Sequence, residues 1–167
     1  MNSNLLFDFT VNKENNTIHI KREFNANIEL AWKAWTTAEL LDQWWGPKPW
    51  KVETKTMDFR EGGFWHYAMV GPEGEKHWSK ANYISIEKEK SFTQRDVFCD
   101  ESGTINPAFP QDLWENYFNS KENKVQVDML LTFDTLADLE KIIEMGFKEG
   151  MITDFQQLDE LLLTLNK

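Results

Sequence analysis

The sequence predicts an α+β fold, in which helices near the end of the chain cover one face of an antiparallel sheet. Apolar and polar residues alternate in several short runs, as in 17–24, where Ile18 and Ile20 share one face. This period of two is typical of half-buried strands. Residues 147–165 instead carry an apolar stripe at helical spacing, which predicts a long amphipathic helix. The stripe consists of Met151, Phe155, Leu158, Leu162 and Leu165. Strands first and helices last favour the α+β class.

Length and charge limit the possible functions. The chain has 167 residues, so we expect one domain over 1–167, and its formal net charge is −10. Such a charge argues against binding to nucleic acid or to an anionic membrane surface, because phosphates repel it. No apolar run approaches the roughly 20 residues that span a bilayer. Residues 1–16 lack the pattern of a signal peptide, and Cys99 is the single cysteine, so a cytoplasmic location is expected.

Turn and cap signals mark the boundaries of the elements. Asn27 is placed to cap a short helix, and Thr37 a second one that Gly46 and the following prolines end. Thr135 and Asp138 have the spacing of a capping box before the C-terminal helices, and Gly146 is expected to end or bend the first of these. Tight turns are predicted at 62–63 and 71–74. Strand patterns cover 5–11, 17–24, 51–57, 64–70, 77–87, 91–98 and 125–133.

The stretch LLDQWWGPKPW, residues 40–50, concentrates Trp44, Trp45 and Trp50 around a glycine and two prolines. These rings either close a corner of the sheet or line an apolar pocket. For Trp45 and Trp50 the structural role is favoured. For Trp44 the two roles are equally supported, since it ends a helix expected to face the interior, and aromatic walls are typical of ligand pockets.

Three segments in order resemble a known family. These are REFNANIELAWKAWTTAELLDQWWGPKPW, MDFREGGFWHYAMVGPEGEKHW and LEKIIEMGFKEG, which lie within residues 17–165. Together they resemble activator of 90-kDa heat shock protein ATPase homologue-like domains, members of the START-like (SRPBCC, Bet v-like) superfamily. The resemblance implies a helix-grip fold, with a curved antiparallel sheet wrapped around a long C-terminal helix, two short helices after the first strands, and a cavity between sheet and helix.

The resemblance and the aromatic content together lead to a first functional hypothesis. The superfamily includes lipid carriers, hormone receptors and polyketide cyclases, which favours a small apolar ligand in the cavity. Aromatic residues make up 14% of the chain, with eight Trp and twelve Phe, and large rings leave gaps that ligands use. The expected ligand-binding residues are Trp35, Trp44, Trp65, Tyr67, Met69, Trp78, Tyr83, Trp114, Met145, Phe147 and Met151. Each of these side chains also has a plain role in the core.

Two other classes stay open. The eukaryotic namesake stimulates a chaperone ATPase, using more than this one domain, so a co-chaperone that binds a 90-kDa heat-shock ATPase is the second hypothesis. A cyclase- or hydrolase-like enzyme is the third, because no acid–base pair is recognisable. We expect no catalytic residues and no cofactor, and the sequence does not indicate the oligomeric state.

Several chemically reactive residues have ordinary interpretations. His19, His66 and His77 have no metal-ligand spacing, so no metal is expected. The acids that follow Cys99 are expected to raise the pKa of its thiol, which disfavours a nucleophile. Asp58 and Arg60 are expected to form a turn-stabilising ion pair rather than to reach into the cavity.

Residues 99–124 are predicted to form a long connection between two strands. PQDLWENYF, within 110–118, places Leu113, Trp114, Tyr117 and Phe118 at helical spacing. We therefore expect a short helical turn whose aromatic side docks over one end of the cavity. A static plug and a mobile lid satisfy the same burial equally well.

Overall fold

The computed structural model describes residues 5–166 and contains eight strands and four helices among them. The elements follow in the order β1 (Phe7–Asn12), β2 (Thr17–Phe24), α1 (Ile28–Thr36), α2 (Ala38–Trp44), β3 (Lys51–Met57), β4 (Phe64–Val70), β5 (Lys76–Glu87), β6 (Ser91–Cys99), β7 (Asp112–Lys121), β8 (Lys124–Phe133), α3 (Leu136–Glu144) and α4 (Phe147–Leu165). The strands form one sheet in the order β1-β2-β8-β7-β6-β5-β4-β3. Every neighbouring pair is antiparallel.

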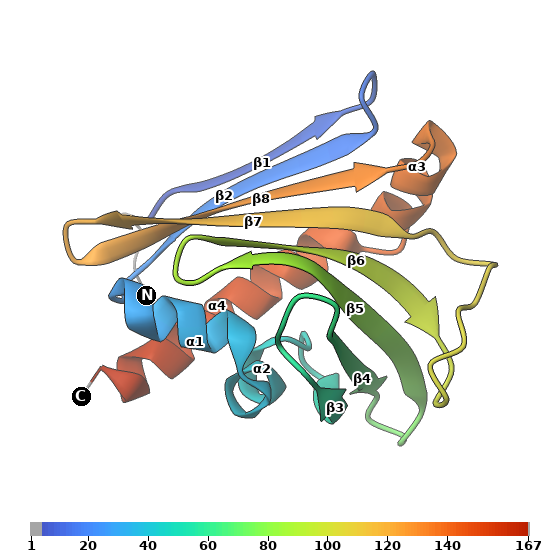
Figure 1. The fold of residues 1–167 in the computed structure, drawn as a ribbon, viewed down its shortest axis with the longest axis horizontal. Helices are drawn as coiled ribbons and strands as arrows, with labels where there is room; N and C mark the ends of the chain where they lie inside the picture. Colours follow the sequence, from blue (N-terminus) through green and yellow to red (C-terminus); the bar gives the residue numbers. More distant parts are fainter. Residues whose placement is uncertain (1–4, 167) are drawn as a thin grey trace.

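The sheet curves around α4, as the sequence predicts. Figure 1 shows β1, β2, β8 and β7 across one side of the molecule, and the remaining strands bending round toward the other. The register shifts between Thr54 and Thr56 in β3, and between Tyr83 and Ser85 in β5. Such irregularities bend a strand and increase its twist. α4 crosses the concave side from α3 to the C-terminus, and α2 packs beside it.

α4 buries most of its predicted stripe. Met151, Phe155, Leu158 and Leu162 are all buried against the sheet. The expectation for Leu165 is wrong, since it is 40% exposed, because the helix ends at this residue and the last turn extends past the sheet-facing core.

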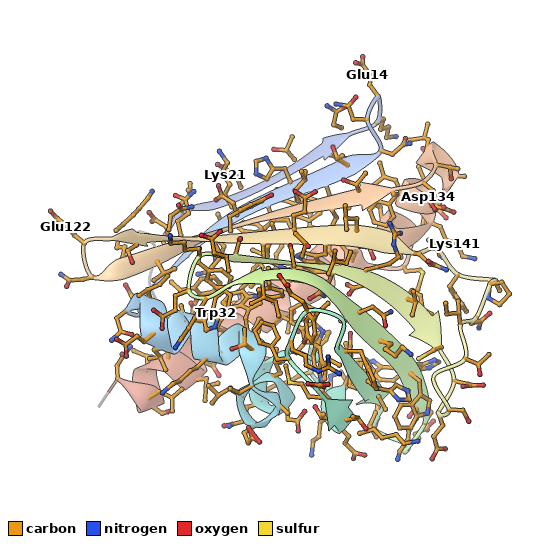
Figure 2. The ribbon with its side chains drawn as sticks, in the orientation of Figure 1. Glu14, Lys21, Trp32, Glu122, Asp134 and Lys141 are labelled. Atoms are coloured by element: carbon orange, nitrogen blue, oxygen red, sulfur yellow. The ribbon has the colours of Figure 1, made fainter. Side chains whose placement is uncertain are left out.

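α1 contributes an aromatic cluster to the same core. Trp32 extends from α1 toward the sheet (Figure 2), and its ring meets Phe59, Phe92 and Phe118 at centroid distances of 5.9, 5.7 and 5.2 Å. All three contacts are edge-to-face, the geometry that ring quadrupoles favour. The helical face of α1 is thereby locked against β6 and β7.

The predicted caps and turns are largely confirmed. The Asn27 side chain accepts from the Leu30 amide at 2.8 Å, and the Thr135 hydroxyl accepts from the Asp138 amide at 3.1 Å. Thr37 is the N-cap residue of α2, but its hydroxyl donates to the Lys33 carbonyl and does not accept from an α2 amide. Gly146 adopts a φ of 88° between α3 and α4, a conformation in which glycine avoids the strain of other residues. The turns at 62–63 and 71–74 are present.

The prediction for residues 99–124 is wrong in its main point. Residues 112–121 form β7, a strand paired with both β6 and β8, so there is no helical turn at PQDLWENYF. The inward residues of β7 include Trp114, Asn116 and Phe118. Asn116 interrupts the apolar alternation of the inward residues. As a result, the outward Leu113 and Tyr117, taken together with Trp114 and Phe118, show a spacing that resembles that of a helix. The connection is confined to 100–111.

Two remaining expectations concern the ends of the chain and the membrane. None of the helices within 5–166 has both the length and the apolar composition to cross a membrane. The expectation about a leader segment falls partly on residues 1–4, which lie outside the described residues.

Candidate functional site: a cavity between the sheet and the C-terminal helix

A cavity of about 230 Å³ lies between the concave face and α4; it is called the inner cavity below. Its wall is mostly apolar and comes from residues 45–47 after α2, from β4, β5, β6 and β7, from the 100–111 connection and from both C-terminal helices. The lining residues are Trp45, Pro47, Tyr67, Met69, His77, Ser79, Asp96, Val97, Phe98, Pro110, Asp112, Trp114, Ile142, Phe147, Gly150, Met151 and Asp154. The volume exceeds the roughly 150 Å³ of an engineered cavity that binds benzene.

The tryptophan-rich segment is fastened to α4 by one glutamine. The Gln157 side chain donates to the carbonyls of Trp44 (3.0 Å) and Gly46 (2.8 Å), and accepts from the Lys48 amide at 3.0 Å. These bonds satisfy backbone groups at the end of α2, which the helix itself leaves without partners. They hold Trp45 and Pro47 against the inner cavity.

The three tryptophans of this segment have three different environments. Trp44 is fully buried, and its indole donates to the Ala34 carbonyl at 2.9 Å. Trp45 lines the inner cavity and donates to the Tyr67 hydroxyl at 3.3 Å. The ring of Trp50 lies 5.4 Å from that of His77. The wall position considered for Trp44 is thus occupied by its neighbour Trp45.

An outer pocket of about 580 Å³ adjoins the inner cavity. The two share Pro47, Met69, His77 and Phe98 in their linings. The remaining lining residues of the outer pocket are Trp50, Lys76, Trp78, Cys99, Asn106, Phe109 and Met145. The inner cavity therefore continues toward the surface along the 100–111 connection.

A third cavity of about 20 Å³ lies deeper, beneath α1. Its lining includes Trp35, Trp114 and Asn116, whose indole Nε1 atoms and amide Oδ1 atom are buried without a hydrogen-bond partner among the described residues. A space of this size has room for about one water molecule. It is too small for an organic ligand.

The residues expected to bind a ligand are divided among these spaces. Tyr67, Met69, Trp114, Phe147 and Met151 line the inner cavity. Trp35, Trp65 and Tyr83 line the third cavity, whereas Trp78 and Met145 line the outer pocket. Trp44 lies outside all three. Trp78 pairs with Ala68 and its ring contacts His66 on the face opposite to Trp65, since residues opposite in register share a face.

Three carboxyl groups, called the carboxyl cluster below, line the inner cavity: Asp96, Asp112 and Asp154. Asp96 on β6 and Asp112 on β7 are direct register partners, and Asp154 comes from α4. Asp154 is 3% exposed, and its Oδ1 has no hydrogen-bond partner among the described residues. Asp96 Oδ1 accepts a hydrogen bond from the side-chain amide of Gln94 at 2.6 Å.

Burial shifts all three acids toward the protonated form. It raises the pKa of Asp154 to about 8, and that of Asp96 to about 7, although the Gln94 hydrogen bond opposes the latter shift. Burial, and then the neighbouring Asp96, raise the pKa of Asp112 well above its usual value, against the effect of Arg95. Water removal disfavours the charged form of an acid, so an apolar cavity has this effect.

The sequence reasoning missed this cluster, although each acid breaks an apolar pattern. Asp96 follows Phe92 on the inward face of β6, and Asp112 precedes Trp114 on that of β7. Asp154 lies within the buried stripe of α4. Acids at inward positions are rare unless they have a partner or a role, and this signal was available in the sequence.

The other reactive residues have the following environments. Asp58 and Arg60 form the expected ion pair, at 2.7 Å and exposed to solvent. The pKa of the Cys99 thiol is raised as expected, but burial is the leading cause and Asp100 contributes less. His66 and His77 pair with Lys80 and Met69 and do not face each other. Within residues 5–166, no group of three or more His, Cys, Asp and Glu side chains is arranged to hold a metal ion.

The fold and its cavity define a helix-grip domain of the START-like class. The sequence matches the family model described as activator of Hsp90 ATPase homolog 1-like protein over residues 25–163. The chain therefore belongs to this family. A comparison with proteins of curated function found no match.

Solved structures from several bacteria are similar along nearly the whole chain. A crystal structure of a protein from Mycobacterium smegmatis is 26% identical, with a TM-score of 0.86 and 95% of this chain and 96% of that chain covered. A solution NMR structure from Arthrobacter aurescens is 28% identical, with a TM-score of 0.88 and coverage of 94% and 91%. One from Staphylococcus epidermidis is 27% identical, with a TM-score of 0.82 and coverage of 93% and 94%.

Proposed function

We propose that this protein binds a small apolar molecule in the inner cavity, between the concave face of the sheet and α4. The observation that carries the proposal is the cavity itself: about 230 Å³ lined mostly by aromatic and aliphatic side chains. Concave, mostly apolar spaces with a few placed polar groups are typical ligand sites. Of the ligand-binding residues expected from the sequence, the proposed contacts are Tyr67, Met69, Trp114, Phe147 and Met151. The geometry of the cavity adds Trp45.

Binding rather than catalysis is the function proposed. The cavity wall is built on rigid elements, because the rings of Trp65 and Tyr67 stack with their centroids 3.9 Å apart, and the Trp45 indole is hydrogen-bonded to the Tyr67 hydroxyl. Such a wall favours shape recognition of an apolar body. The single domain and the cytoplasmic location expected from the sequence stay predictions.

A pair of variants at Gly150 tests the proposal. Gly150 lines the cavity, and a Cβ atom there would lie 3.7 Å from Pro47 Cγ, an ordinary contact. Gly150→Leu should fill part of the cavity, whereas Gly150→Ala should leave most of it open. Native mass spectrometry of protein purified from its own host should detect a bound small molecule on the wild type and the Ala variant, and lose it on the Leu variant. Equal retention by a folded Leu variant would place the ligand elsewhere.

A co-chaperone function is the second candidate, favoured by the family match over residues 25–163. The partner would be a 90-kDa heat-shock ATPase of the same host. Because this chain carries a net charge of −10, its contact surface on the partner is expected to be basic. Pull-down with the host chaperone, together with its ATPase rate with and without this protein, tests the idea. No recovery and an unchanged rate would dismiss it.

A further inference from the structure

We propose that the ligand of the inner cavity is an apolar molecule that carries a protonated amine, held by the carboxyl cluster. The inference rests on the proposed function and names the ligand class for the same cavity. It follows from three features of the cavity: where the carboxyl groups lie, what they lack, and which charges surround them.

The carboxyl cluster lines the cavity on two sides. Asp96 and Asp112 are directly opposite each other on antiparallel strands, so their side chains project from the same face of the sheet at short separation. Asp154 approaches from α4, on the other wall. The sheet wall and the helix wall of the cavity therefore each carry a carboxyl group.

Asp154 lacks a partner that a ligand would supply. Its side chain is 3% exposed, and the buried Oδ1 receives no hydrogen bond from the described part of the chain. A buried acceptor without a donor is costly, and a purely apolar ligand would leave it so. The neighbouring positions Met151 and Phe155 are apolar, so Asp154 is the polar contact that this stretch of α4 offers.

The charges at the cavity favour a cation. No lysine or arginine belongs to the described lining, and His77 and Tyr67 are its titratable side chains besides the carboxyl cluster. Arg95, next to Asp96 on β6, is the cation that acts on Asp112. Asp96 and Asp112 repel each other when both are ionised, and an ammonium group would relieve this repulsion through charge-assisted hydrogen bonds. A carboxylate ligand would increase it. The net charge of −10 also attracts cations to the molecule.

The size of the site sets the size of the apolar part. An inner cavity of about 230 Å³ accommodates a single ring or a short chain beside the carboxyl cluster. A longer molecule would extend into the outer pocket past Met69 and Phe98, which line both spaces.

Three matched probes test the ligand class by isothermal titration calorimetry: phenylbutylamine, phenylbutanol and phenylbutanoate. They share one apolar body and differ in the head group. The amine should bind most tightly and the carboxylate most weakly. Asp154→Asn, which keeps the shape of the side chain, should weaken the amine by about 10- to 100-fold and change the alcohol little, as for loss of a charged hydrogen-bond partner. Glu160→Gln, an exposed position on the same helix, is the matched control and should change neither.

A second readout uses the wild-type protein alone. Binding of an ammonium group converts a protonated carboxyl of the cluster into a carboxylate, so a proton is released to the buffer. Titration near pH 7 in two buffers of different ionisation enthalpy should therefore give different apparent enthalpies for the amine and equal ones for the alcohol.

The possible outcomes separate the two proposals. If the alcohol binds as tightly as the amine and no proton is released, the amine class is overturned while the apolar site stands. If none of the three probes binds, the proposed function fails together with the inference.

Discussion

Arg22 on β2 and Asp159 on α4 form a two-pronged ion pair that joins the sheet to the helix it surrounds. Nη1 and Nη2 of the guanidinium donate to the two carboxylate oxygens at 3.1 and 2.6 Å. The side chains are 10% and 23% exposed, and the guanidinium also lies 4.7 Å from the ring centroid of Phe24. This contact fixes α4 at the end of the sheet remote from α3.

Removing one partner of this pair should be costly. Asp159→Ala leaves the Arg22 guanidinium buried without its counter-charge, and we expect a loss of about 3 kcal/mol in the free energy of unfolding. Urea denaturation measures the loss. The exposed neighbour variant Glu160→Gln should stay within about 0.5 kcal/mol of the wild type. A loss below about 1 kcal/mol for Asp159→Ala would mean that the pair is effectively solvated, as surface pairs are.

The carboxyl cluster should make stability depend on pH in an unusual direction. The pKa of Asp154 is about 8 in the folded protein, above its value in an unfolded chain. The folded state thus holds the proton more tightly, and the stabilisation present at low pH is lost as pH rises toward 8. Asp96, with a pKa of about 7, and Asp112, with a raised pKa, act in the same direction.

Asp154→Asn isolates this effect, because it removes one titrating group and keeps the shape of the side chain. Between about pH 5 and 8, the free energy of unfolding of the wild type should fall more steeply than that of the variant, by up to about 1.4 kcal/mol per pH unit. Denaturation at a series of pH values gives both slopes. Parallel slopes would show that Asp154 titrates as an ordinary carboxyl group.

Replacing Gly150 by alanine should stabilise the fold, whereas the same replacement at Gly146 should destabilise it. Gly150 lies inside α4, where glycine costs about 0.5–1 kcal/mol relative to alanine, and a Cβ atom there meets only ordinary contact. Gly150→Ala should raise the free energy of unfolding by about that amount. Gly146→Ala should lower it, since Gly146 has a φ of 88°. Thermal denaturation of the two variants should give shifts of opposite sign, and shifts of the same sign would contradict this account.

The sequence predicts most of the fold because local periods coincide with the final environments. In β2 every second residue from Ile18 to Phe24 is buried, and the stripe of α4 meets the sheet from Met151 to Leu162. β7 was missed because Asp112 and Asn116 occupy inward positions that an ordinary strand would fill with apolar residues. The pairing of β7 with both β6 and β8 outweighs this local departure from a strand pattern.

The candidate site was only partly predictable. Tyr67 could be assigned to a cavity wall from its strand face and the family resemblance, whereas Trp114 was expected there on a helical turn and reaches the cavity from β7 instead. The inward position of each acid was a signal in the sequence, but their convergence on one cavity could not be predicted, because it depends on the register of β6 with β7 and on the placement of α4. Trp44 and Trp45 differ by about 100° around a helix, so the end of α2 decides which one meets the cavity.

The 100–111 connection is the remaining part of the predicted lid. Pro110 lines the inner cavity, and Phe109 the outer pocket. Lys141 on α3 holds the segment in place, donating to the Ala108 carbonyl at 2.9 Å and lying 4.9 Å from the Phe109 ring centroid. Lys55 donates to the Glu101 carbonyl at 2.8 Å. Both lysines are attached through exposed contacts, which contribute little to stability.

Hydrogen exchange should therefore separate this connection from the strand that follows it. Amides of 112–121 are paired within the sheet and should be as protected as those of 124–133, whereas amides of 100–111 should exchange faster and slow down when a ligand occupies the inner cavity. Lys141→Ala should speed exchange at 106–109 and leave 112–121 unchanged. If 100–111 is as protected as β8 in the free protein, the connection is a static plug; if ligand leaves its exchange unchanged, it does not close over the cavity.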